Sequence, residues 1–479
     1  MRYARRKSVF FTIMIICCFM LVMLGAISSI VRAEVPGAAS PLEYLLKLDG
    51  AVSEGNDYGD ILSIDGVPIA SGYTAESGEY KYCAVSGWSD IVGSPSGGLI
   101  YNCRNILLAN GSRANLLLHK GNSITTTLHS TGMRTAQEEL AEYGRDVNAY
   151  ICVVLRDGAV LVSQGNNSYP QEAFFDPYNY DDLYVDYCSS RSLKGSTFKP
   201  LTLRMLLLNN EALGDEYSLY NQEFKDFNQA TVRGHTIINW DSCISGNYLT
   251  DEGGGIMSRT LSLSDALQLS ANTYVLRHAD KFGLENTYRK MTELYSLNKV
   301  IHTEINELSV GKVSSERLAY FPWGQDADLS AVEMCQLYNY MTGGTYSMPF
   351  YVAGVTKPDG KVIYTAEPVK VREKELDIEL RTDILDNALA DTFCSYLTKD
   401  QLHRFAKLVN SRRVLAKSGT ADLAGESVNR VMMLTVLNED RTKVICSACM
   451  CIDHTYDYDI QNSYMIEKLV AVLNSMGIL

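Results

Sequence analysis

The chain has 479 residues, a formal net charge of −13 at pH 7 and 21% charged residues. An acidic chain lacks the basic face that general binding of nucleic acids requires, so that class of function is excluded. The length exceeds that of one ordinary domain, and 46% hydrophobic residues are enough for a core, so we expect two or more folded units.

The N-terminal residues predict a membrane anchor. Residues 1–7 contain three arginines and one lysine, and residues 8–31 carry no charge before Arg32 ends the run. A run of this length can cross a bilayer as a helix, and the positive charges in front of it place the N-terminus in the cytoplasm. We predict a cytoplasmic tail at 1–7, a single transmembrane anchor at 8–32 and an extracytoplasmic remainder. A cleaved signal peptide is the alternative, although its apolar region is normally shorter.

An N-terminal module is predicted at 33–145. After a short linker at 37–41, this part is rich in glycine, serine and tyrosine, with short strand-like runs and one helical pattern at 133–144. Neither a repeat nor a low-complexity tract interrupts the sequence. We therefore expect a small, strand-rich unit.

The second predicted part, 146–479, combines strands with helices. Two strand patterns flank Asp157-Gly158, a strong turn signal, and helical patterns dominate 196–340. A strand pattern at 412–422 precedes a second hairpin at 431–452, and an amphipathic helix pattern closes the chain at 460–476. Five strands split in this way predict one antiparallel sheet covered by helices, which is an α/β or α+β fold.

The cysteines and histidines predict no metal site and no cofactor. The 12 cysteines lack the density and spacing of a disulfide scaffold. Residues 446–451, CSACMC, contain a CxxC motif, but no second CxxC or histidine pair accompanies it. We interpret these cysteines as small residues of a buried strand. The seven histidines show no ligand spacing.

The reactive candidates are short motifs whose order along the chain carries the information. Ser196 and Lys199 form an SxxK motif, and Lys417-Ser418-Gly419 is the one K[ST]G motif. Four SxN motifs begin at Ser245, Ser270, Ser296 and Ser427. The order SxxK, SxN, K[ST]G is the one used by penicillin-binding proteins and serine β-lactamases. A second SxxK begins at Ser296, but no SxN lies between it and Lys417.

Among the SxN motifs we favour Ser270-Ala271-Asn272, because it lies between two amphipathic helical patterns. Ser245 lies in a glycine-rich stretch, and Ser296 lies late in a helical pattern. A catalytic SxN motif needs a rigid loop between packed helices. Ser270 and Asn272 meet this condition best.

The spacing of Ser196 and Lys199 suits nucleophilic catalysis. Residues i and i+3 share one face of a helix, so Lys199 can reach the Ser196 hydroxyl. A serine hydroxyl becomes a good nucleophile only when a base takes its proton. Lys199 can serve if burial and a nearby cation lower its pKa, and Lys417 is the candidate cation. Taken singly, Ser196 could be a helix N-cap and Lys417 a strand-edge charge.

Flanking segments extend the pattern into a family resemblance. KGSTFKP at 194–200, AKSGTAD at 416–422 and the segments 59–70, 125–144 and 323–344 are similar to those of monofunctional (class B) penicillin-binding proteins. The resemblance implies a transpeptidase fold at 146–479, with a five-stranded antiparallel sheet flanked by helices and a helical subdomain. It also implies a smaller, β-rich, pedestal-like module at 33–145. Tyr58 stands where arginine is usual, and Lys194 stands where proline is common.

The resemblance also implies roles for the motif residues. Backbone N–H groups of Ser196 and Thr420 would form the oxyanion hole, and Ser270 would relay a proton to the leaving amine. Asn272 would hold the amide of the substrate. The third motif would bind the carboxylate of the terminal D-alanine through Lys417, Ser418, Gly419 and Thr420.

The expected function is that of a membrane-anchored peptidoglycan D,D-transpeptidase and penicillin target. Its partners would be stem peptides, β-lactams, a polytopic membrane glycosyltransferase and division or elongation proteins. A D,D-carboxypeptidase or β-lactamase on the same fold is one alternative. A non-catalytic β-lactam sensor or assembly scaffold is the other.

Overall fold

The computed structural model describes most of the chain beyond residue 56. The described residues are 57–74, 80–84, 88–93, 98–109, 112–144, 147–166, 186–297, 301–305, 307–308, 317–343, 345–372, 383–422, 427–455 and 460–479. The predicted tail at 1–7 and anchor at 8–32 lie outside these residues and stay predictions. Within the described ranges, no helix is long and apolar enough to span a membrane.

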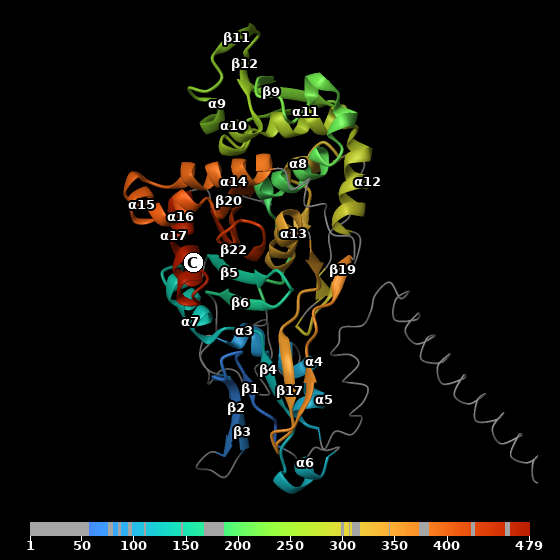
Figure 1. Ribbon diagram of the computed structural model, residues 1–479, viewed down its shortest axis with the longest axis vertical. Helices are drawn as coiled ribbons and strands as arrows, with labels where there is room; N and C mark the ends of the chain where they lie inside the picture. The colour runs from blue at the N-terminus through green and yellow to red at the C-terminus, as the bar shows by residue number, and fades with distance from the viewer. Residues whose placement is uncertain are drawn as a thin grey trace, which may run out of the picture.

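A five-stranded antiparallel sheet occupies the middle of the molecule (Figure 1). Its strands, in spatial order, are β20 (Val414–Asp422), β21 (Ser427–Leu437), β22 (Val444–Thr455), β5 (Asn148–Leu155) and β6 (Val160–Gly165). All four pairings are antiparallel, which confirms the predicted sheet and both predicted hairpins.

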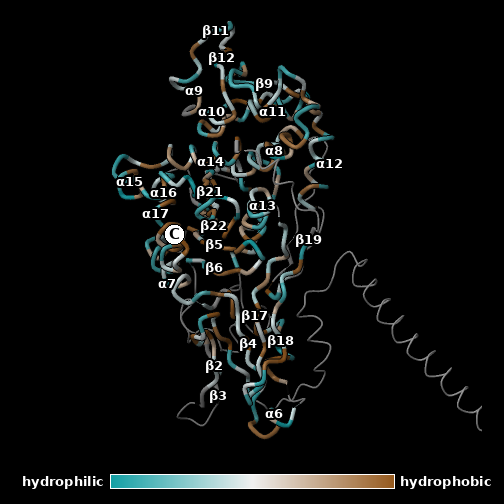
Figure 2. The backbone as a smooth tube through the Cα atoms, viewed as in Figure 1, coloured by the Kyte–Doolittle hydropathy of each residue, from teal (hydrophilic) through white to brown (hydrophobic). Residues whose placement is uncertain are grey.

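The middle strands of this sheet form the core. Figure 2 shows hydrophobic residues along them. Cys446, Cys449 and Cys451 of β22 are fully buried, which confirms their interpretation as core residues. The chain places β22 in the centre because its side chains are apolar on both faces, as expected for a strand covered on both sides.

Helices cover both faces of the central sheet. On one face, α13 (Ala331–Gly343) packs against β5 and β22, and every one of its residues is buried. On the other face, α17 (Asn462–Ser475) and α7 (Ser130–Leu140) pack against each other and against the sheet. The helix α14 (Asp383–Tyr396) packs against the edge strand β20. Flanking helices were predicted, and α17 confirms the predicted closing helix.

A helical region lies above the sheet in Figure 1. Its helices are α8 (Lys199–Leu207), α10 (Leu263–Gln268), α11 (Asn272–Phe282) and α12 (Leu284–Tyr295). The prediction that helices dominate 196–340 was incomplete, because small strands fill 224–261. These strands are β8 (Phe224–Phe227), β9 (Gln229–Val232), β10 (His235–Ile238), β11 (Thr250–Gly253) and β12 (Ile256–Leu261).

The hairpin β9–β10 has a turn that sequence patterns rarely signal. Its two central residues, Arg233 and Gly234, both have positive φ, at 52° and 80°. A two-residue hairpin turn requires this conformation and normally uses Asn-Gly or Asp-Gly. An arginine in the first position hides the turn from a sequence pattern.

A six-stranded sheet lies at the opposite end from the helical region (Figure 1). Its order is β18 (Val362–Thr365), β17 (Val352–Thr356), β4 (Ser123–Thr126), β1 (Ile61–Leu62), β2 (Pro68–Thr74) and β3 (Tyr80–Ala84). Its first two strands come from far later in the chain than residue 145, so this sheet joins early and late segments. The predicted domain boundary at 145 stays a prediction.

Short helices accompany this sheet where one helical pattern was predicted. They are α3 (Ser89–Val92), α4 (Gly98–Asn102), α5 (Arg104–Leu107) and α6 (Arg113–Leu118). Four to six residues are too few for a periodic pattern, which explains the omission. Other short elements include β7 (Ser192–Leu193), α9 (Asp241–Ile244), β13 (Ile301–His302), β14 (Glu307–Leu308), β15 (Asp328–Leu329), β16 (Tyr346–Ser347), β19 (Lys370–Arg372), α15 (Lys399–Arg404) and α16 (Ala406–Ser411).

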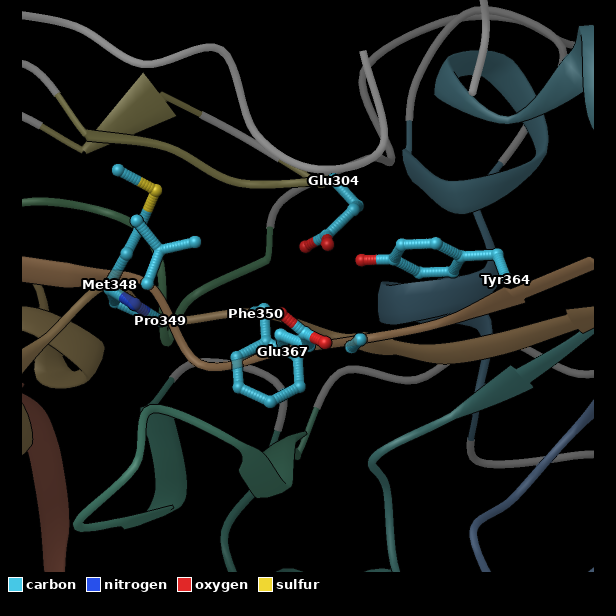
Figure 3. Close-up of a pocket in the computed structure, with 8 residues that line it drawn as sticks. Glu304, Met348, Pro349, Phe350, Tyr364 and Glu367 are labelled. Carbon is cyan, nitrogen blue, oxygen red and sulfur yellow. The ribbon is translucent and has the colours of Figure 1, made fainter. Parts of the chain in front are cut away.

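A small pocket lies beside the β17–β18 hairpin and contains a buried acid (Figure 3). The backbone N–H of Tyr351 donates to Glu304 Oε2 at 2.9 Å, and Figure 3 shows the Tyr364 hydroxyl pointing toward the same carboxylate. Burial raises the pKa of Glu304 to about 7. Asn102 of α4 donates to the carbonyl of Glu304 at 2.9 Å. The acid therefore lies where an early helix meets the late hairpin.

Candidate active site

The candidate nucleophile lies in a tight turn that leads into a helix. Residues Gly195–Phe198 form a 3₁₀ turn, and α8 continues from Lys199 with Pro200 in its first turn, where proline needs no hydrogen-bond donor. Side chains at i and i+3 eclipse in a 3₁₀ turn, so Ser196 and Lys199 share one side. Ser196 is 5% exposed and Lys199 is fully buried.

Two glycines bring this turn into backbone contact with β20. Gly195 has φ +53°, and a Cβ there would lie 2.2 Å from the carbonyl oxygen of Thr420. A Cβ on Gly419 would lie 2.5 Å from the carbonyl oxygen of Lys194. Any larger residue would push the turn and the strand apart. The contact places Ser196 beside the third motif.

The second motif closes the site from the helical region. Lys199 Nζ donates to the Ser270 carbonyl, to Ser270 Oγ at 3.2 Å and to Asn272 Oδ1 at 2.6 Å. Ser270 has φ +56°, a conformation that costs a serine energy and is concentrated at functional sites. Asn272 is the first residue of α11. Among the described residues, Ser245 and Ser296 of the other SxN motifs make no such contact with Lys199.

The third motif places a second buried lysine at the same hydroxyl. Lys417 Nζ donates to Ser270 Oγ at 3.0 Å, so this oxygen lies between two lysine side chains. Lys417 is also fully buried. Burial, followed by the positive charge of Lys417, lowers the pKa of Lys199 well below its usual value. These are the two physical causes that the sequence argument required for a neutral Lys199.

Ser196 Oγ itself has no hydrogen-bond partner among the described residues. Lys199 directs its N–H groups to the second motif instead. The i, i+3 spacing predicted that Lys199 can reach the Ser196 hydroxyl, and no hydrogen bond joins the two groups among the described residues. Catalytic hydrogen bonds commonly tighten only when a substrate is bound. The two groups nevertheless face the same side of the turn.

Three further polar residues complete the site, and the sequence analysis missed them. Asn239 Oδ1 accepts the backbone N–H groups of Asn272 and Thr273 at 2.6 and 3.1 Å, so it caps α11. The Tyr396 hydroxyl accepts from Lys417 Nζ at 3.3 Å. Their residue types are common, and their sequence distance from the motifs hides any local signal.

Arg430 is the third missed residue, and it adds positive charge beside the third motif. Its Nη1 donates to Thr420 Oγ1 at 2.9 Å. The Ser418 hydroxyl donates to the Tyr396 hydroxyl at 2.8 Å. Because β20 is an edge strand, its outer side has no strand neighbour among the described residues and meets the turn of Ser196. The arrangement suits an anionic ligand laid along β20.

The site offers a serine, two buried lysines, amides and hydroxyls. Within the described residues, no group of three or more His, Cys, Asp or Glu side chains could hold a metal ion. The predicted residues Ser196, Lys199, Ser270, Asn272 and the third motif converge in one place. This chemistry fits transfer of an acyl group through a serine ester.

Comparisons with known proteins place the chain in a family. Residues 151–459 match the model of the penicillin-binding protein transpeptidase domain. No curated protein matches the chain in sequence.

Solved structures with the same fold include a D,D-transpeptidase domain of a peptidoglycan glycosyltransferase from Eggerthella lenta, with 19% identity and a TM-score of 0.66. The match covers 89% of this chain and 100% of that one. Penicillin-binding protein A from M. tuberculosis, as a penicillin G acyl-enzyme, has 16% identity and a TM-score of 0.68. This match covers 88% of this chain and 99% of that one. Penicillin-binding protein 3 from the same organism has 13% identity and a TM-score of 0.68, covering 88% and 97%. Because the family match spans more than half of the chain, this protein belongs to the penicillin-binding protein transpeptidase domain family.

Proposed function

We propose that this protein is a membrane-anchored peptidoglycan D,D-transpeptidase that works through an acyl-enzyme on Ser196. The observation that carries the proposal is the convergence of Lys199, Ser270 and Lys417 around one hydroxyl beside Ser196. Membership of the transpeptidase family supports it. The predicted anchor at 8–32 would hold the catalytic domain outside the cytoplasmic membrane.

In the first half-reaction, Ser196 Oγ attacks the carbonyl carbon of the penultimate D-alanine. Neutral Lys199 takes the hydroxyl proton, and the lowered pKa of Lys199 makes the neutral form available. The oxyanion is stabilised by the N–H groups of Ser196 and Thr420, and loss of one such donor typically costs about 3 kcal/mol. The bond to the terminal D-alanine then breaks.

The leaving amine needs a proton, and the hydrogen bonds of Ser270 support a path for it through this hydroxyl. Ser270 Oγ lies between Lys199 Nζ and Lys417 Nζ at 3.2 and 3.0 Å. The proton taken by Lys199 can pass through this hydroxyl to the nitrogen of the departing D-alanine. The acyl group remains on Ser196 as an ester.

In the second half-reaction, an amine of a neighbouring stem peptide attacks the ester. Lys199 accepts the proton of the amine by the same path, and Ser196 recovers its hydroxyl proton as the new amide forms. Before acylation, the carboxylate of the terminal D-alanine, which leaves in the first half-reaction, is bound by Lys417 and by the hydroxyls of Ser418 and Thr420. Arg430, which donates to Thr420 Oγ1, adds positive charge behind this contact.

β-Lactams mimic the donor peptide and should acylate the same serine. The experiment is labelling of the full chain with a fluorescent penicillin. Wild type should form a stable covalent adduct, and Ser196→Ala should form none while it keeps its melting temperature. Equal labelling of the two proteins would refute the assignment of Ser196.

Transfer and hydrolysis are separated by the fate of the acyl group. The protein is incubated with a D-Ala-D-Ala peptide, with and without an amine acceptor, and the products are identified by mass. A transpeptidase gives the cross-linked product when acceptor is present. Hydrolysis alone identifies a D,D-carboxypeptidase, and rapid turnover of penicillin identifies a β-lactamase.

We further propose a polytopic membrane glycosyltransferase and division or elongation proteins as partners.

A further inference from the structure

A lysine buried behind the nucleophile is not explained by the proposed chemistry. Lys194 lies two residues before Ser196, where the resembling proteins commonly have proline. Its side chain is fully buried. Lys194 Nζ donates to Ser192 Oγ at 2.7 Å and to the Tyr150 hydroxyl at 3.2 Å, and it lies 3.8 Å from Cys451 Sγ. A buried ammonium is costly unless it has partners of this kind.

The contacts of Lys194 reach the two strands that lie farther into the sheet. Tyr150 on β5 and Cys451 on β22 stand directly opposite each other in the ladder. Lys194 Nζ contacts both, and it lies 5.5 Å from the centre of the Tyr150 ring. The side chain thus extends from the catalytic turn to the centre of the sheet.

The segment of Lys194 is also bound by the two remaining strands on this side. Asn429 Nδ2 of β21 donates to the Leu193 carbonyl at 2.8 Å and to Ser192 Oγ at 3.1 Å. The Lys194 carbonyl lies against Gly419 of β20. Residues 192–195 therefore cross the ends of four neighbouring strands, and each strand supplies a contact.

The sulfur atom next to Lys194 lies beside a second buried thiol. Cys451 Sγ lies 3.5 Å from Cys449 Sγ. Burial opposes ionisation of the Cys451 thiol, but the hydrogen bond with Cys449 and the positive charge of Lys194 lower the pKa of Cys451 below its usual value. Removing one partner of such a buried polar contact leaves the other unsatisfied, which costs free energy.

The backbone at Lys194 explains why a side-chain tether is needed. Proline fixes φ near −65° and would stiffen the turn by itself. Lys194 has φ −103°, outside the range of proline. The turn in this chain therefore adopts a backbone that proline does not favour, and polar contacts of the side chain take over the restraint. The Lys194 carbonyl also accepts from Thr197 Oγ1 at 2.7 Å, one residue beyond the nucleophile.

We infer that Lys194 is a positioning residue that fixes the Ser196 turn on the central sheet through its buried contacts with Ser192, Tyr150 and Cys451. The inference rests on the proposed function, because the property that it explains is the placement of the nucleophile. Misplacement of a reacting group by about 1 Å can cost about 100-fold in rate. Loss of the tether therefore slows acylation more than it weakens the first, non-covalent binding of penicillin.

The test measures the acylation rate constant and the non-covalent binding constant separately, by stopped-flow with a fluorescent penicillin on the full chain. Lys194→Met keeps most of the length of the unbranched side chain and removes its amino group and hydrogen bonds. We expect acylation to slow about 10- to 100-fold, with the binding constant changed less than about threefold. Ser192→Ala, a smaller change that removes one partner of Lys194, should slow acylation several-fold, and the two changes together should slow it no more than Lys194→Met alone.

Lys468→Met is the matched control for loss of a buried lysine. Lys468 lies on α17, far from Ser196 in the sequence. Its side chain is 6% exposed and contacts Glu139 and Glu142. It should lower the melting temperature and leave the acylation rate constant unchanged. If Lys194→Met and Ser192→Ala are acylated with the wild-type rate constant, the inference is overturned while the proposed function stays intact. Equal slowing by Lys468→Met would also overturn it. Absence of labelling in wild type would instead overturn the proposed function, and the inference with it.

Discussion

The second buried lysine gives a quantitative prediction about acylation. Lys199 Nζ and Lys417 Nζ share Ser270 Oγ at 3.2 and 3.0 Å, so they lie within about 6 Å of each other. At an effective dielectric constant of about 20, two unit charges at this distance repel by about 3 kcal/mol. This repulsion, after burial, lowers the pKa of Lys199. Lys417→Met removes the repulsion and should raise that pKa.

The sign of the effect follows from the proposed role of Lys199 as a base. Acylation needs neutral Lys199, so the rate rises as pH rises through its pKa. A higher pKa moves the acidic limb of the pH–rate profile to higher pH. At a fixed pH on that limb, about 3 kcal/mol corresponds to a loss of about 100-fold. Burial remains in the variant, so the pKa of Lys199 should stay below that of a free lysine.

The assay is the second-order rate constant for labelling by a fluorescent penicillin between pH 5 and 10. Lys417→Met should also lose the proposed contact to the ligand carboxylate, which would lower the height of the profile. The readout is therefore the position of the acidic limb. Ser418→Ala is the control, because it weakens the same motif without changing its charge. Its limb should stay in place. An unmoved limb in Lys417→Met, or a limb at lower pH, would refute the electrostatic argument.

Three other changes test separate parts of the structure. Asn239→Ala removes the acceptor for two N–H groups of α11. It should lower the free energy of unfolding by about 1–2 kcal/mol and slow acylation. An unchanged melting temperature would contradict the capping role. Gly195→Ala places a Cβ 2.2 Å from the Thr420 carbonyl oxygen at φ +53°; it should abolish labelling, and wild-type labelling would mean that the turn does not touch β20. Glu304, whose pKa is about 7 when folded and lower when unfolded, should destabilise the fold as pH rises from about 4.5 to 7. Relative to wild type, Glu304→Gln should therefore raise the free energy of unfolding by up to about 3 kcal/mol at pH 8 and by little at pH 5. Denaturant unfolding measures both values. A variant with the same pH dependence of stability as wild type would exclude this role of Glu304.

The sequence predicted the central sheet because its signals are local. The Asp157-Gly158 turn lies between two apolar strands, and the second hairpin has a polar turn of similar clarity. The hairpin with Arg233 at its turn and the late strands β17 and β18 were not predictable in this way. Strand β17 pairs with β4, more than 200 residues earlier in the chain, and no local pattern encodes such a pairing.

The candidate site was predictable where order and spacing carry information. The order of the motifs excluded Ser427, and the position between two helical patterns favoured Ser270 over Ser245 and Ser296. The structure brings Ser270 to Lys199 and Lys417. Asn239 shows the limit of this approach. It is an ordinary asparagine in a loop, and its role depends on two N–H groups more than 30 residues later. Such a contact is a property of the packed helices, which no motif describes.

Lys194 shows why a departure from a family pattern needs a structure to be understood. The sequence marks it as unusual, and it also marks Cys451 as a buried strand residue, but it gives no link between the two. The link depends on register: Cys451 pairs with Tyr150 across β22 and β5, and both side chains face the turn that carries Ser196. A shift of one residue along β22 would point Cys451 to the other face of the sheet and leave Lys194 without this partner. The effects of changing Lys194 and Cys451 should therefore depend on each other. Cys451→Ala should slow acylation in the wild-type background, and it should slow acylation less in the Lys194→Met background.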